Sequence, residues 1–246
     1  MRSIPRTTFA ILAICAMSLH AQEDQPARRA STFPKIQEIA DGVLNVGGVT
    51  FDKNTRTISF PGTLNMDDGM LEYLIVEEGG KTHESLLATK IEPYHLHLAM
   101  LLLGAKVEKQ GNVPQPPDAI NLQYLKTAPK PKGDGVIIRV RWTQEGKPVV
   151  VNAEDLIYNM QEKAPMTRGP WIYSGSMLVS GLFLAQQERS IAALVIDPTA
   201  LINNTRPGCD NDQIWCVCHE KAPKSGTLVE ISMQLQTPPP ETKPAQ

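Results

Sequence analysis

The stretch from Leu71 to Ala105 constrains the fold more than any other part of the chain. It reads LEYLIVEEGGKTHESLLATKIEPYHLHLAMLLLGA and holds the densest run of large apolar side chains. Two strand-like segments flank Gly79-Gly80, which supply the positive-φ positions that a tight hairpin turn needs. A helix is predicted at 93–103, because proline stands at its first position and apolar side chains lie on nearly every face. We therefore expect a hairpin and a buried helix at the centre of the core.

Alternation of apolar and polar residues predicts strands along most of the remaining chain. The clearest is GVIIRVRW at 135–142, with Val136, Ile138 and Val140 on one face. A shorter helix is predicted at 153–160, capped by Asn152 and with acidic residues in its first turn. The sequence thus predicts an α+β fold, a mostly antiparallel sheet of about nine strands packed on these two helices.

The first 21 residues have the pattern of a signal peptide. Arg2 and Arg6 precede an apolar run, Phe9 to Leu19, that is too short to span a bilayer of about 30 Å. We expect cleavage near Ala21. Lipidation at Cys15 is disfavoured because the residue before it is isoleucine rather than a small residue. The protein is therefore expected to be periplasmic or secreted.

The rest of the chain divides by composition. Residues 22–34 are polar and without periodicity, which predicts a disordered lead-in, and the proline-rich residues 237–246 predict a disordered tail. Between them we expect one α+β domain at 35–236. Its long connection at 105–134, which holds five prolines, is a candidate subdomain seam.

Charge and hydropathy exclude some classes of partner. Without the signal peptide the chain has 22 basic and 26 acidic residues, which is too acidic and too mixed for a nucleic-acid-binding surface. No later stretch approaches the roughly 20 apolar residues of a transmembrane helix. On a strand at 135–142, Arg139 and Arg141 would share a face that can contact an acidic partner, although an exposed sheet face explains them equally well.

Three residues of the central stretch are candidates for ligand or metal binding. His83 and Glu84 are adjacent, so on a strand only one of them faces the helix. His95 and His97 lie about 200° apart on a helix, so only one faces the strand. We select His83, Glu84 and His97, with a divalent metal as the candidate ligand, while the structural alternative is a core histidine at 97 and a solvent-facing histidine at 95.

Cys209, Cys216 and Cys218 form a second candidate group, followed by His219. Covalent haem attachment requires CxxCH, which WCVCH does not match. In an exported protein a disulfide is the default, and we expect Cys209 to pair with one of the other two cysteines. Metal binding by the CxC pair with His219, to copper or zinc, and three reduced thiols are the alternatives.

The central stretch resembles the YdjY-domain family of exported bacterial proteins. The resemblance rests on LEY, GGKxHESLL and P-x-x-LH-x-A-x-LLLGA, and more loosely on RVRW, AEDLI and WIYSGS. The matching positions are Glu72, Gly80, Lys81, His83, Glu84, Leu96, His97, Gly104 and Ala105. The resemblance implies no established activity. It also implies that the three cysteines are additions in this member, which favours a local disulfide over a shared cofactor such as an iron–sulfur cluster.

No serine-hydrolase elbow, Walker loop or dinucleotide-binding glycine motif is present in the sequence. We therefore expect a non-enzymatic exported module that binds an envelope protein or a small ligand and carries no cofactor. The alternative is a metal-binding or redox protein that uses His83, Glu84 and His97, with or without the cysteine group.

Overall fold

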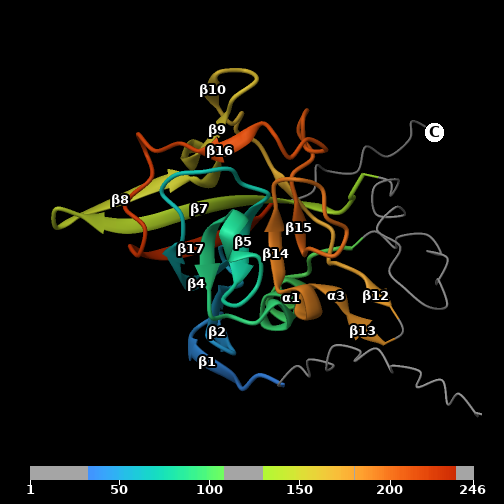
Figure 1. Cartoon of the computed structure of the whole chain (residues 1–246). Coiled ribbons are helices and arrows are strands. Elements are labelled where there is room, and N and C mark those ends of the chain that lie inside the picture. Colours follow the sequence, from blue (N-terminus) through green and yellow to red (C-terminus); the bar gives the residue numbers. More distant parts are fainter. Residues whose placement is uncertain (1–32, 108–129, 180, 237–246) are drawn as a thin grey trace, which may run out of the picture.

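The computed structural model describes residues 33–107, 130–179 and 181–236. The predicted signal peptide, the proline-rich tail, nearly all of the lead-in and most of the long connection lie outside these residues. Within the described part the chain is mostly β-structure with two short α-helices (Figure 1). No described helix is both long and apolar enough to cross a membrane.

The strands vary from two to eleven residues. In chain order they are β1 (Ile36–Ala40), β2 (Val43–Val46), β3 (Val49–Asp52), β4 (Thr57–Leu64), β5 (Tyr73–Glu77), β6 (Ser85–Thr89), β7 (Asp134–Gln144), β8 (Lys147–Asn152), β9 (Ile157–Asn159), β10 (Ala164–Pro165), β11 (Trp171–Tyr173), β12 (Leu178–Val179), β13 (Leu182–Phe183), β14 (Ser190–Ala193), β15 (Ile202–Asn203), β16 (Trp215–Val217) and β17 (Leu228–Leu235). The helices are α1 (Pro93–Leu102) and α3 (Leu184–Glu188), with 3₁₀ turns η1 (Thr82–Glu84) and η2 (Ala153–Leu156).

Eight of these strands close into a barrel. Their order around it is β4, β17, β7, β11, β15, β14, β5 and β6. The ring closes where β6 pairs antiparallel with β4, through Thr63 opposite Ala88 and Leu64 opposite Leu87. This finding corrects the predicted α+β class, since the strands surround a core of their own instead of packing as an open sheet on the helices at 93–103 and 153–160.

Two pairs in the ring are parallel, β5 with β6 and β14 with β15. The predicted hairpin at Gly79-Gly80 is therefore wrong. Gly79 does have a positive φ of 83°, but the chain then runs back over the sheet at 78–84 before β6 begins. The segment 194–201 makes the same kind of return between β14 and β15. Both returns are shorter than the dozen or more residues that a parallel connection usually takes.

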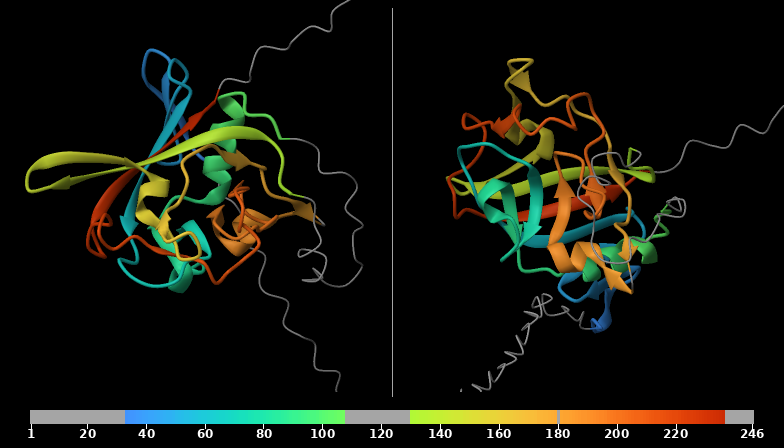
Figure 2. Two further views of the ribbon diagram at one scale, coloured as in Figure 1. Left: turned by 90° about the horizontal axis from the view of Figure 1, so that it is seen from above. Right: turned by 45° about the vertical axis from the view of Figure 1, so that its right-hand side comes forward.

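Two extensions leave the barrel. The strands β1, β2 and β3 continue from the first half of β4, whose second half pairs with β6. The strand β8 pairs with β7 alone, and their hairpin projects far from the body, as the left view of Figure 2 shows. The two-residue loop of this hairpin uses positive φ at Glu145 and Gly146, as a tight turn with right-handed strands requires.

The helices also differ in part from prediction. α1 confirms the helix expected at 93–103, and Pro93 stands at its start. The helix expected at 153–160 is wrong, because only η2 forms there and the apolar residues that follow it become β9. Its cap is nevertheless present, since the backbone N–H of Asn152 donates to Asp155 Oδ2 at 3.2 Å. A local cap starts a helical turn, but pairing with β16 redirects the chain after one turn.

The core lies inside the barrel and continues beneath α1 and the small sheet of β10, β9 and β16. Strands β4, β17 and β7 alternate strictly, so that Phe60, Ile231 and Ile138 point inward while neighbouring polar residues face solvent. β5 and β6 are buried at every position, because the returns and loops cover their outer face. A second apolar cluster, of Tyr73, Val76, Ala193 and Ala200, is separate from this core.

Candidate functional site

The two returns meet at a polar network that we call the crossover clasp, made of Lys81, Tyr73 and Asp197. Lys81 Nζ donates to the Tyr73 hydroxyl at 2.6 Å and lies 4.8 Å from the ring centroid. That hydroxyl donates to Asp197 Oδ2 at 2.9 Å. The other carboxylate oxygen accepts from the N–H and hydroxyl of Thr199 at 2.8 and 2.7 Å. The clasp thus ties the return at 78–84 to the return at 194–201.

Burial and the negative charge of Asp197 raise the pKa of Tyr73 far above its ordinary value. The residue therefore remains a neutral phenol that donates to Asp197 while accepting from Lys81. Such a chain of charge-assisted hydrogen bonds fixes geometry strongly in a partly buried setting. Tyr73 and Asp197 were not among the predicted site residues, because nothing in the sequence shows that segments 124 positions apart meet.

Side-chain hydrogen bonds to backbone carbonyls hold the first return in place. Asn65 Nδ2 donates to the carbonyl of Thr82 at 2.5 Å and to that of Ser85 at 2.7 Å. The Ser85 hydroxyl donates to the Lys81 carbonyl at 2.6 Å. These bonds satisfy a turn that leaves the sheet, so the chain can re-enter parallel to β5 without burying unpaired backbone groups.

Glu72, His83 and Glu84 lie near the clasp, within electrostatic range of its residues or of one another. His83 Nε2 lies 3.6 Å from Glu84 Oε2, with side chains 79% and 21% exposed. Burial raises the pKa of Glu72, and the negative charges of Glu84 and Asp212 raise it further, while Lys81 and His83 act in the opposite direction. The structure therefore brings two predicted residues, His83 and Glu84, together with an acidic residue that the resemblance had marked.

The third predicted residue, His97, has different partners. Its Nδ1 lies 2.7 Å from the Tyr173 hydroxyl, and its ring centroid lies 4.8 Å from that of Phe183. Burial lowers the pKa of His97 to about 4 and raises that of Tyr173. A neutral imidazole and a protonated phenol mean that Tyr173 donates to Nδ1. His95, which was expected to face solvent in the structural alternative, is buried, and its ring packs against Gly47.

No group of three or more His, Cys, Asp or Glu side chains within residues 33–107, 130–179 and 181–236 is arranged to hold a metal ion. His83 and Glu84 contact each other, whereas His97 contacts Tyr173 and Phe183. The role of the three residues in ligand binding stays a prediction.

The predicted disulfide is absent, and this is a correction. Cys209, Cys216 and Cys218 are all free thiols, and no two of them lie at bonding distance. The reason is that Cys209 follows a different turn, in which its carbonyl accepts from the Ile196 N–H at 2.7 Å. Cys216 lies on β16 and Cys218 directly follows its last residue, Val217, and strand neighbours two apart point the same way but do not bond.

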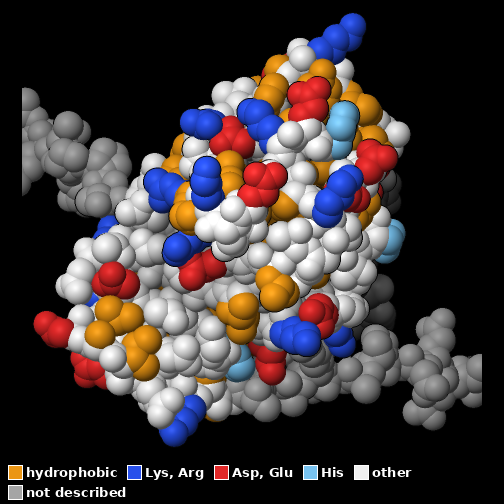
Figure 3. All heavy atoms as spheres, turned by 90° about the vertical axis from the view of Figure 1, so that its left-hand side faces the viewer, with side chains coloured by type: hydrophobic (Ala, Val, Ile, Leu, Met, Phe, Trp, Pro, Cys, Tyr) orange, Lys and Arg blue, Asp and Glu red, His pale blue; other side chains and the backbone are white. Residues whose placement is uncertain are grey.

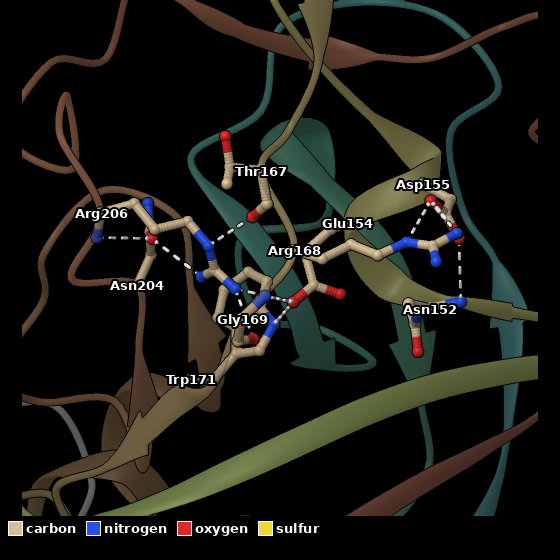
Figure 4. Close-up of polar contacts among 9 residues, drawn as sticks. All are labelled: Asn152, Glu154, Asp155, Thr167, Arg168, Gly169, Trp171, Asn204 and Arg206. Atoms are coloured by element: carbon tan, nitrogen blue, oxygen red, sulfur yellow. Dashed lines mark hydrogen bonds and ion pairs between the residues drawn. The ribbon is translucent and has the colours of Figure 1, made fainter.

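A second polar group, the arginine cluster, was not predicted at all. It contains Glu154, Asp155, Arg168 and Arg206 (Figure 4). Arg206 Nη2 donates to Glu154 Oε1 at 2.6 Å and to the Gly169 carbonyl at 2.6 Å, with side chains only 11% and 2% exposed. The Arg206 guanidinium also lies 5.1 Å from the Trp171 ring, whose N–H donates to Glu154 at 3.2 Å.

All three guanidinium nitrogens of Arg206 donate to protein acceptors, so the cluster fastens η2, β11 and the chain after β15 to one another. Burial raises the pKa of Glu154 and lowers that of Arg206, and each charge opposes the shift of the other. Next to this pair, Arg168 donates hydrogen bonds to both carboxylate oxygens of Asp155 at 2.8 to 3.0 Å, but the Arg168 side chain is 66% exposed. The cluster is a structural junction rather than an open site.

A groove of about 580 Å³ crosses the outer face of β3, β4, β17 and β7. Its walls carry hydroxyls from Thr50, Ser59 and Thr143, and an apolar surface from Pro61 and Leu228. At its centre Arg141 Nη1 lies 3.8 Å from Glu230 Oε1, and both side chains are more than half exposed. Of the features described, this groove is the one that offers an incoming molecule unburied polar and apolar groups together.

Comparison with known proteins identifies the family of this chain. Searches of curated proteins and of solved structures found no match to this chain. The sequence profile of the YdjY domain matches residues 49–234, which is well over half of the chain and runs from β3 to β17. It therefore includes every strand of the barrel, the crossover clasp and the arginine cluster. The chain belongs to the YdjY domain family.

Proposed function

We propose that the protein is an exported, non-enzymatic module that binds an extended segment of an envelope protein in the groove on the outer face of its barrel. The observation that carries the proposal is the groove itself, which crosses four adjacent strands and exposes apolar and hydrogen-bonding side chains side by side. The signal-like pattern of the first 21 residues supports export.

The composition of the groove is suited to recognition of a polypeptide. Leu228 is 79% exposed on β17, where an unpartnered leucine would be an apolar anchor. Arg141 holds Glu230 only at 3.8 Å, which leaves guanidinium donors for a carboxylate or carbonyl of the partner. Arginine is one of the residue types enriched at the centre of protein interfaces, which makes Arg141 the polar centre of this surface.

The projecting hairpin extends this surface beyond the barrel. Val150 of β8 lies opposite Arg141 of β7, and its side chain is 56% exposed on the same face of the sheet. On the face turned toward a viewer from the hairpin side, apolar side chains lie among charges of both signs (Figure 3). Such a mixed surface favours a partner with alternating apolar and polar residues over a uniformly charged one.

A peptide library displayed on phage and panned against the folded protein tests the groove. We expect recovered peptides to bind at least tenfold more weakly to Leu228→Asp and Arg141→Glu variants. Met160→Asp is the matched control, because Met160 is also exposed, at 43%, but does not line the groove. Peptides whose binding is the same in all variants would show that the groove is not the binding surface.

Export has its own test. Expression of the whole chain in a Gram-negative host, followed by fractionation and N-terminal sequencing, should give a periplasmic protein that begins near residue 22. Recovery of the uncleaved chain from the cytoplasm alone would contradict export and leave the groove experiment unaffected.

A further inference from the structure

Two cysteines and a methionine lie close together along β16 and the segment that it bridges. The N–H of Leu71 donates to the Trp215 carbonyl at 3.0 Å, and the N–H of Val217 donates to the Gly69 carbonyl at 3.0 Å. These two bonds frame Met70 and Cys216 as directly opposed residues in an antiparallel bridge.

A pair framed in this way is the non-hydrogen-bonded kind, in which the Cα atoms lie about 4.5 Å apart and the side chains are closest. The thioether of Met70 and the thiol of Cys216 therefore share one face. Trp215 and Val217 occupy the opposite face and are buried. At the bridge this face is accessible, since Met70 is 39% exposed and Cys216 is partly exposed, whereas Cys218 is buried.

Cys218 adds a second thiol to this face. It follows Cys216 by two positions, just after β16 ends, and it is only 6% exposed. Its N–H donates to the Leu156 carbonyl next to β9 at 2.9 Å, which continues the pairing of β16 by one residue and keeps the side-chain period of a strand. Burial raises the pKa of Cys216, and the charges of Cys218 and Asp68 raise it further, so both groups lie within electrostatic range of its sulfur. Cys209 is in a separate turn, next to Ile196.

The chemistry of this set is selective. Two thiolates and one thioether are soft ligands, which favour copper(I), an ion that accepts two or three sulfur donors. A structural zinc site needs four ligands, and no third Cys, His, Asp or Glu joins the two cysteines in the described part of the chain. His219 follows Cys218 in an exposed turn beyond β16 and is not part of this set.

We propose that Cys216, Cys218 and Met70 form a copper(I) site. Binding replaces the two thiol protons, which pass to solvent, and the copper remains in its +1 state, so no oxidant or reductant is consumed. Copper then lies between β16 and the bridge strand at Met70, and it links the small sheet to the segment that leads into β5. The site is independent of the groove.

The test is an anaerobic titration of the reduced full-length chain with copper(I) in competition with bicinchoninate. Every variant carries Cys15→Ser, so that only the three described cysteines contribute thiols. We expect one tightly held equivalent of copper(I), a loss of at least a hundredfold in affinity in Cys216→Ser and in Cys218→Ser, and unchanged affinity in the matched Cys209→Ser variant. No retained copper, or equal losses in all three serine variants, would overturn the proposal.

Met70→Leu tests the copper site even where a serine variant folds poorly, because leucine preserves the side-chain volume at an exposed position. We expect its affinity for copper(I) to fall about tenfold, with weak zinc binding that does not change. Copper K-edge absorption should show a first shell of sulfur alone. A nitrogen or oxygen scatterer in that shell, or an affinity unaffected by Met70→Leu, would show that the methionine is not a ligand.

Discussion

His97 shows how burial sets the state of a single residue in this fold. Its imidazole accepts from Tyr173 and packs on Phe183, and burial holds its pKa near 4. The unfolded chain would protonate the same histidine near the ordinary value of 6.5. Between these two values the unfolded state binds more protons than the folded state, so acid favours unfolding.

We therefore predict that stability is fully present above pH 6.5 and is lost as the pH falls toward 4. The loss from this residue is on the order of 2 kcal/mol, after allowance for its partial exposure. Urea unfolding of wild type and His97→Gln at pH 7 and pH 4.5 measures it. The pH dependence should be smaller in the variant than in the wild type. An equal dependence in wild type and His97→Gln would contradict the buried, neutral assignment.

Gly47 is the residue that lets His95 enter the core. Its φ is +58°, and a Cβ there would overlap the His95 ring. Gly47→Ala should cost about 2–4 kcal/mol, from backbone strain and the clash together. Gly146→Ala is the matched control, with a φ of +75° and nothing within 4 Å, and should cost only about 1 kcal/mol. Thermal unfolding compares them, and equal losses would mean that His95 does not pack against this turn.

Among elements, the arginine cluster joins η2 to β11 and to the chain after β15. Replacing Arg206 by methionine leaves Glu154 buried without its charge partner, which typically costs about 3–5 kcal/mol. Arg168→Met removes the exposed ion pair with Asp155 and should lower the free energy of unfolding by less than about 1 kcal/mol. The double variant Glu154→Gln with Arg206→Met should recover part of the loss. Chemical denaturation measures all three, and a small effect of Arg206→Met would show that the pair does not hold the junction.

The crossover clasp is predicted to act as one unit. Tyr73→Phe removes the donor to Asp197 and should cost about 1–2 kcal/mol, and Lys81→Met should cost a similar amount. Because the two residues share one hydrogen-bond chain, the double variant should lose less than the sum, by about 0.5–1 kcal/mol. Strict additivity in a double-mutant cycle would mean that the two returns are held independently.

Some elements that depend on local sequence were predicted, whereas the helix expected at 153–160 and the pairing of the strands were not. Strand β7 and helix α1 follow from alternation and from a proline at the helix start. The direction of β6 could not be predicted, because Gly79-Gly80 between strand-like segments is equally a hairpin signal. Asn65 and Ser85, which pin the return, act through tertiary contacts that no local pattern records. For the site, the sequence indicated Glu72, Lys81 and His83 through family resemblance.

For the same reason the sequence did not show that Lys81 and its neighbours lie close to Asp197. The prediction of a disulfide among the three cysteines was wrong for this reason too. A pattern such as CxC reports which side chains share a strand face, but it does not report which turn brings a distant third cysteine near them. The Asp-Pro-Thr sequence at 197–199 was a usable signal of a polar turn, since Asp197 does accept from the Thr199 N–H and hydroxyl.

At the scale of the whole molecule, the fold is defined by ring closure. Eight strands with two parallel pairs remove the free edges that an open sheet would expose, so β4 need not be protected along its second half. The free edge at β8 belongs to the projecting hairpin, where Pro148 offers no N–H to a further strand. The family profile covers the whole ring, which suggests that the barrel is the unit that the family shares.

The most direct test of this account is a set of nuclear Overhauser contacts between backbone protons of the folded protein. The closed barrel predicts contacts between Thr63 and Ala88, and parallel contacts that place Ile75 beside Leu87. An antiparallel series centred on Gly79-Gly80, with Glu77 opposite Thr82 and no contact between Thr63 and Ala88, would contradict it.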